Sequence, residues 1–220
     1  MIIKYNNKVV THNDKWIGYS GEPTPSLPPY TLRLKYKDDV TPTFNYGTGV
    51  QVSSSPNIWD LTYENSNWWD ILNNHTDLLE VIYGNTSGVT SISSMLTGCT
   101  SLTNVALFDT HNVTSMINVF NGCTSLTTVP LFDTSNVTII HSMFYGCTSL
   151  TNIPLFDTSK VTNMDFAFNR CTNVQSGALA LYQQASSQTN VPSHTYTFYD
   201  CGVNTQTGAA ELAQIPDDWK

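Results

Sequence analysis

Cysteine and aspartate are the residue types of this chain that could most readily act as nucleophiles or metal ligands. Both recur at a fixed interval along its 220 residues. Four of the five cysteines lie 24 residues apart, at Cys99, Cys123, Cys147 and Cys171. Zinc sites pair cysteines roughly two to four residues apart, so this spacing predicts no metal site. If the chain coils at this interval, neighbouring cysteines lie about 5 Å apart and a disulfide between Cys99 and Cys123 is geometrically feasible. Because cysteine is also small and apolar, we interpret the four as a structural inner row.

The aspartates Asp109, Asp133 and Asp157 follow the same 24-residue interval. Carboxylates stacked one above another repel each other unless each is bound. Backbone amides of the aspartate's own turn are one partner, and a calcium ion is the alternative, although the glycine-rich calcium-binding repeat pattern is absent. Whether this row binds a cation stays open at this point.

The histidines give no recognised catalytic pattern. There are five of them, at His12, His75, His111, His141 and His194. The sequence contains no HExxH motif, no nucleophile-elbow motif and no P-loop. A pair of Cys147 with His141 is conceivable, but the register directs this cysteine inward. We therefore predict a protein that is not an enzyme and needs no cofactor, with a hydrolase as the least favoured alternative.

The cysteines and aspartates belong to one 24-residue repeat, which brings into register residues 83–106, 107–130, 131–154 and 155–178. Residues 59–82 follow the same register more weakly, with His75 in the place of the cysteines, and we interpret them as a divergent capping coil. Trp68 and Trp69 are expected to help close that end. No coil can bury its apolar side alone, so stacking of the coils should create the core.

Each coil is predicted to contain a short strand, a turn and a helical turn. The apolar alternation of the strand falls at Leu126, Val129 and Leu131. One face of the helical turn follows at Ile140, Met143 and Phe144. Gly146 then provides a left-handed end.

The repeat unit LFDTSNVTxxxxMFxGCTSLTxxP resembles the BspA-like leucine-rich repeats of bacterial surface proteins and of phages of gut bacteria, over about residues 78–178. The resemblance implies an α/β-type leucine-rich-repeat solenoid, with short strands and helical turns, that serves adhesion or recognition. It does not fix a ligand, because one fold carries many functions.

The flanking segments complete the predicted domain organisation. Residues 1–29 read as an N-terminal arm with a strand candidate at 8–10 and a proline-rich tether, and residues 30–58 as a small β element in which 30–36 pair with 49–55. The solenoid then covers 59–178. Residues 179–220 read as a helical C-terminal cap, with a closing helix that is capped by Thr207 and ends near Pro216.

Composition excludes some partners. Charged residues make up 12% of the chain and its formal net charge is -8, so it lacks the clustered Lys and Arg that nucleic acid requires. The sequence has no secretory h-region and no 18-residue apolar span, so we predict neither Sec export nor membrane insertion. A virion component released by lysis fits these features, and a bacterial surface or secreted adhesin is the alternative.

Two surfaces are candidates for ligand binding. The first consists of positions on the helical turn that vary between coils, and comprises Ile117, Ile139, His141, Tyr145 and Phe166. An alternative role for these residues is packing against the terminal segments or a second subunit, which leaves a homo-oligomer possible. The second is a flat strand face that suits glycan but lacks aromatic residues, and comprises Thr103, Asn104, Thr127, Thr128, Thr151 and Asn152. We expect the solenoid to meet a bacterial surface or glycan, and the N-terminal region to contact other virion proteins.

Overall fold

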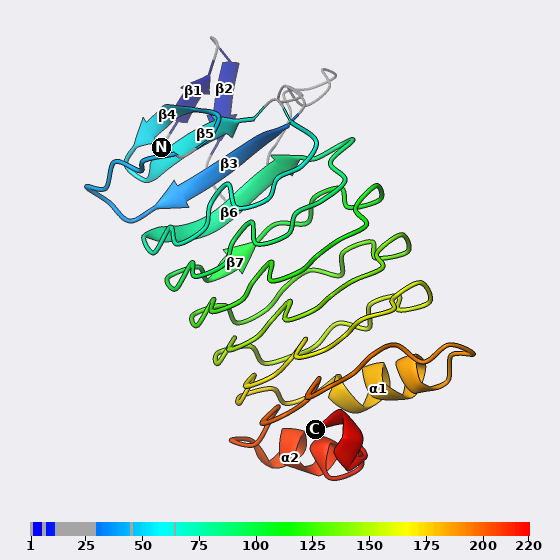
Figure 1. The fold of residues 1–220 in the computed structure, drawn as a ribbon. Helices are drawn as coiled ribbons and strands as arrows, with labels where there is room; N and C mark the ends of the chain where they lie inside the picture. Colours follow the sequence, from blue (N-terminus) through cyan, green and yellow to red (C-terminus); the bar gives the residue numbers. More distant parts are fainter. Residues whose placement is uncertain (1, 6–7, 12–29, 45, 64) are drawn as a thin grey trace.

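A computed structural model describes the whole chain except residues 1, 6–7, 12–29, 45 and 64. A β-sheet lies at one end, a stack of coils follows, and the two α-helices lie at the other end (Figure 1). Near the N-terminus, β1 (Ile2–Tyr5) and β2 (Lys8–Thr11) form an antiparallel pair, and β2 contains the strand candidate at 8–10. The predicted proline-rich tether lies outside the described residues.

The sheet has five strands in the order β4-β5-β3-β6-β7. They are β3 (Thr31–Tyr36), β4 (Thr48–Ser54), β5 (Asn57–Thr62), β6 (Leu78–Asn85) and β7 (Asn104–Val105). The predicted pairing of 30–36 with 49–55 is wrong, because β5 lies between β3 and β4 and pairs with both. The strand β5 also runs across the predicted boundary between residues 58 and 59.

A buried ion pair marks the centre of this sheet. Arg33 on β3 lies opposite Asp60 on β5, and its Nε and Nη2 each donate to a carboxylate oxygen of Asp60 at 2.7 Å. This bidentate pairing allows a charged side chain to be buried in the central strand. Residues on both faces of β3 are therefore buried or partly buried, so the alternation of apolar and polar residues in its sequence does not separate a core face from a solvent face.

Backbone hydrogen bonds join each coil to the next at equivalent positions. β6 and β7 are parallel, and further parallel bridges link Ser115 with Ile139 and Ile139 with Asn163. Along the row at Asn118, the amide donates to the carbonyl of His141 at 3.0 Å, and the carbonyl of the preceding residue accepts from Ser94 at 2.7 Å. Each such peptide group thus directs its C=O toward the preceding coil and its N–H toward the following one.

The prediction of a helical turn is wrong, because the backbone there is not helical. The apolar residues of its predicted face are nevertheless buried. Residues 141–146 form consecutive turns, and Ser142 in their middle has a φ of 53°. Its amide donates to Asp165 of the next coil at 2.9 Å, so the i→i−4 bonds of a helix do not form. The left-handed conformation predicted for Gly146 is present, with φ of 70°.

The predicted strand is also shorter than expected. Ala106 donates to the carbonyl of Val81 at 2.8 Å, whereas Pro130 and Pro154 occupy the same place in later coils and have no N–H to donate. Leu131, which was assigned to the inner face, is exposed, and its neighbour Phe132 is buried instead.

The interior of the stack consists of columns of matching side chains. The column of Cys99, Cys123, Cys147 and Cys171 is fully buried, and all five cysteines of the chain are free thiols. Each thiol in this column donates to a backbone carbonyl of the preceding coil, as Cys147 Sγ does to Phe120 O at 3.0 Å. Beside it, the rings of Phe120, Phe144, Phe168 and Phe198 stack at centroid distances of 5.1, 5.3 and 5.8 Å. The disulfide alternative is therefore not realised.

The divergent coil stacks like the others, with Trp68 N donating to Ser91 O at 2.8 Å. Trp68 is buried, but Trp69 is 62% exposed, so only the first of the two tryptophans contributes to the core. His75 Nδ1 lies 2.6 Å from the hydroxyl of Tyr36, and this hydrogen bond joins the coil to the sheet.

At the C-terminal end lie α1 (Ala178–Ser186), α2 (Gln206–Leu212) and the short 3-10 helix η1 (Asp217–Trp219). The N-cap of α2 is Thr205, not the predicted Thr207, because its hydroxyl accepts from Gly208 N at 3.0 Å. Trp219 stacks on His194 at 4.1 Å. Within the part of the chain that the structure describes, neither helix is long and apolar enough to cross a bilayer.

Candidate functional site

The structure brings together part of the first predicted surface. His141 and Phe166 make an edge-to-face contact at 5.8 Å, and Tyr145 and Phe166 line the same hollow. Ile117 and Ile139 lie on the same side of the stack but do not line that hollow. All five residues are partly buried, whereas a contact surface made of them was expected to be exposed.

This hollow, here called the aromatic hollow, has a volume of about 330 Å³. Its lining residues are Tyr145, Phe166, Asn169, Arg170, Tyr196 and Tyr199. The Arg170 guanidinium carbon lies 5.8 Å from the ring centroid of Tyr145, a cation–π distance. Phe166 and Tyr196 are 5.7 Å apart, and Tyr196 and Tyr199 are 5.6 Å apart. Four rings and one cationic group thus line the aromatic hollow, and Tyr196 and Tyr199 are exposed.

The backbone of the aromatic hollow is unusual for such large side chains. Phe166, Arg170 and Tyr196 have φ values of 59°, 60° and 51°, in the left-handed region that bulky residues rarely adopt. Hydrogen bonds to the next segment hold them there, since Phe166 N donates to Thr195 O at 2.9 Å and Arg170 N to Tyr199 O at 2.8 Å. The same left-handed conformation recurs at Ser94, Asn118 and Ser142 of the earlier coils, so it belongs to the repeat and not to this hollow alone.

Arg170 lines the aromatic hollow and carries a sequence signal. Earlier coils place Gly122 and Gly146 at the same position, with φ values of 74° and 70°. Glycine has no steric cost in this conformation, whereas arginine does. The exchange is therefore unfavourable for the backbone, and the side chain that it adds faces the aromatic hollow.

The chemistry available in the aromatic hollow is stacking and hydrogen bonding. Asn169 is held by a hydrogen bond from its Nδ2 to Tyr196 O at 3.3 Å. Among the described residues, no three or more His, Cys, Asp or Glu side chains converge as a metal site would require. Aromatic faces, an amide and a guanidinium are the groups of a binding site.

The second predicted surface is exposed but largely committed to the stack. Five of its six residues are exposed, and Thr151 is partly buried. The Thr103 and Thr151 hydroxyls each donate to a carbonyl of the preceding coil at 3.1 Å. Asn152 accepts from Ser176 at 2.8 Å. These groups already stabilise the coil-to-coil contacts, which leaves fewer of them for a ligand.

The cysteine column offers no nucleophile. Burial raises the pKa of the Cys99 thiol to about 12, and burial likewise raises the pKa of Cys147. Because the thiolate is the reactive form, these residues stay unreactive near neutral pH. The conceivable pair of Cys147 with His141 is replaced by the bond from this thiol to Phe120 O.

The aspartate row is bound by its own turns. One carboxylate oxygen of each aspartate accepts from the backbone amide two residues later, at 2.9 Å for Asp109, 3.0 Å for Asp133 and 2.8 Å for Asp157. Hydrogen bonds from Ser135 lower the pKa of Asp133, and those from Ser159 lower the pKa of Asp157. The described geometry is that of the backbone-amide alternative.

A stack of 24-residue coils joined by backbone hydrogen bonds defines a class of repeat protein. The chain belongs to the family described as "Mycoplasma protein of unknown function, DUF285", whose model matches residues 70–182, just over half of the chain.

No curated protein matches this chain. Among solved structures, it is similar to a leucine-rich repeat protein from Eubacterium ventriosum ATCC 27560, with 18% identity and a TM-score of 0.39 over 55% of this chain and 32% of that one. The match therefore spans about a third of the length of that protein.

Proposed function

We propose that the protein is a non-catalytic interaction module that binds glycan in the aromatic hollow. In this proposal the coils are a BspA-like leucine-rich-repeat solenoid, closed at its C-terminal end by α1 and α2. The observation that carries the function is the hollow that four aromatic side chains line together with Arg170, where arginine replaces the glycine of earlier coils.

Glycan suits the chemistry of the aromatic hollow. A sugar ring has C–H faces that stack on aromatic rings, and hydroxyls that accept from a guanidinium. The volume of about 330 Å³ lies at the lower end of the range for ligand sites, roughly 300–1,000 Å³, so it fits a short stretch of glycan. Tyrosine also provides contact area at low cost in conformational entropy.

We further propose that the module is displayed on a phage particle, where its N-terminal region contacts other virion proteins. The resemblance of the repeat unit to repeats of gut-phage and bacterial surface proteins supports this placement, and a bacterial surface adhesin is the alternative. Detection of the chain in purified particles distinguishes the two, since an adhesin is labelled on intact cells in the absence of phage.

The test of the binding site uses the purified full chain on an array of bacterial-surface and mucin-type glycans. Arg170→Gly restores the residue that earlier coils carry at this position, so it should keep or raise thermal stability while glycan binding falls at least about tenfold. Tyr196→Ala should also weaken binding, and Thr128→Ala on the second surface should not. Unchanged binding in Arg170→Gly, or no glycan bound by the parent chain, contradicts the proposal.

A further inference from the structure

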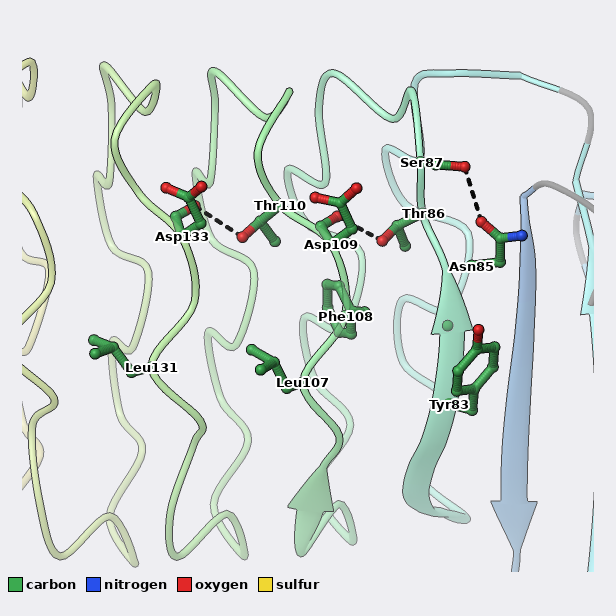
Figure 2. A pocket seen from close by; sticks show the side chains of 11 residues that line it. Tyr83, Asn85, Thr86, Ser87, Leu107, Phe108, Asp109, Thr110, Leu131 and Asp133 are labelled. Carbon is green, nitrogen blue, oxygen red and sulfur yellow. Dashed lines mark hydrogen bonds between the residues drawn. The ribbon is translucent and has the colours of Figure 1, made fainter. Parts of the chain in front are cut away.

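A second hollow lies where the chain leaves β6 and β7, and its volume is about 520 Å³. Figure 2 shows its side chains in two rows, with Leu107 and Leu131 in one and Asp109 and Asp133 in the other. Tyr83 also lines this hollow, in the row of the leucines. We call the hollow, together with Leu155 at the same position of the following coil, the leucine groove.

The apolar row of the leucine groove faces solvent. Its side chains are 39% exposed at Tyr83, 62% at Leu107, 60% at Leu131 and 52% at Leu155. The adjacent Phe108, Phe132 and Phe156 are buried and fill the core. A single exposed leucine is common on protein surfaces, but a continuous row of them is typical of an interaction site.

A row of carboxylates runs beside the leucines. Asp109, Asp133 and Asp157 are exposed, and each uses Oδ1 to bind its own turn. Asp133 Oδ2 lies 3.2 Å from His111 Nδ1. The lowered pKa values of Asp133 and Asp157 keep these groups ionised at neutral pH. The leucine groove thus offers an apolar row and a parallel negative row.

The spacing of the rows selects the shape of an occupant. Coils joined like parallel strands repeat about every 4.8 Å. An α-helix lying along the stack presents its apolar seam about every 5.2 Å, because the seam advances 3.5 residues at 1.5 Å each. Over three steps the helix drifts from the leucines by little more than about 1 Å. An extended strand, with a side chain on one face about every 6.8 Å, drifts by about 6 Å.

We propose that the leucine groove docks an amphipathic α-helix of a partner protein, whose apolar seam lies on Leu107, Leu131 and Leu155 and whose flanking Lys or Arg residues face Asp109, Asp133 and Asp157. This contact is of the helix-in-groove type. It goes beyond the proposed glycan binding and does not depend on it.

Charge excludes two other occupants. A second copy of this chain is also acidic, with a formal net charge of -8, and neither α1 nor α2 contains Lys or Arg. An anionic lipid surface would be repelled by the three carboxylates. The occupant that complements the leucine groove is therefore cationic along one flank.

The test uses a fluorescent, designed 18-residue helical peptide with Leu at i, i+3 or i+4, and i+7 and Lys along one flank, titrated with the full chain. We expect binding that weakens with salt, falls at least about tenfold in Leu107→Ser/Leu131→Ser, and falls less in Asp133→Asn. A matched peptide with Glu in place of Lys should not bind. Both substituted leucines are exposed, so the double variant should stay folded, which its circular dichroism checks.

Arg170→Gly and Thr128→Ala serve as controls, and both should bind the peptide as the parent chain does, which separates this result from the glycan test. The proposal is overturned if the Lys peptide does not bind, if the Glu peptide binds equally well, or if the leucine variant binds unchanged. A dimer that Leu131→Ser dissociates would show instead that a second copy occupies the groove. Binding to phosphatidylglycerol vesicles in preference to the peptide would identify a lipid surface.

Discussion

The leucine groove and the aromatic hollow are built from the same 24-residue coil, but from opposite kinds of position. The leucine groove uses a position that varies little, since Leu107, Leu131 and Leu155 are identical and only Tyr83 in the first of these coils differs. The aromatic hollow uses a position that does vary, where Arg170 replaces glycine. Recurrence in a repeat therefore does not by itself indicate burial, because an extended binding surface also requires the same residue in every coil.

The largest expected effect is on the free energy of unfolding, which should fall when a buried recurrent residue is truncated but not when an exposed one is. Phe144→Ala removes a fully buried ring stacked between Phe120 and Phe168, and should lower the free energy of unfolding by about 3–5 kcal/mol. Leu131→Ala should change it by no more than about 0.5 kcal/mol. Urea denaturation followed by circular dichroism measures both. A comparable loss in the two variants would show that the leucine row is also core.

A smaller effect is expected in the cysteine column. Cys147→Ala removes the thiol that donates to Phe120 O and leaves a small cavity, so the free energy of unfolding should fall by about 1–2 kcal/mol. Phe120 O keeps its bond from Cys123 N, which limits the loss. In the parent chain, thiol labelling at pH 8 should be slow until denaturant is added, because the cysteines are buried and the pKa of each is raised. Rapid native labelling would disprove the inner column.

The smallest effect concerns the carboxylates beside the leucines. Hydrogen bonds lower the folded-state pKa of Asp133 and Asp157, so their contribution to stability is complete above the unfolded value of about 3.9 and is lost as pH falls through the folded pKa. Asp133→Asn should make the urea midpoint less dependent on pH between about pH 5 and pH 2. The effect is small because the group is exposed, and a steeper dependence in the variant would contradict it.

Much of the stack could be predicted from the sequence, because burial demands similar side chains at each turn of the chain. The cysteine column and the buried Met143 and Phe144 follow from the 24-residue interval alone. The choice between Leu131 and Phe132 could not be made in this way, since both are apolar and a one-residue shift exchanges the two faces. The left-handed Ser142 was also hidden, because no glycine marks its position.

The aromatic hollow could be predicted only in part. Tyr145 and Phe166 were found because they vary between coils at one side of the stack. Tyr196 and Tyr199 were not among the predicted surface residues, because they lie beyond the clear repeat, in a segment that hydrogen bonds to residues 164–170 hold beside the last coil. The replacement of glycine by Arg170 is visible in the sequence, but the sequence does not show that the added side chain lines a hollow.

One row of the peptide groups that join the coils has a single direction along the stack. In the row at Asn118 and Ser142, every carbonyl is oriented toward the start of the chain and every N–H toward its end. An internal coil therefore fits any other internal coil on both of its sides, whereas each terminal coil has one side that only its own flanking segment matches. Gene duplication of an interior coil would lengthen the leucine groove by one step, and fusion of a coil at either end would not. Variation in length within this family is expected to arise from the middle of the molecule.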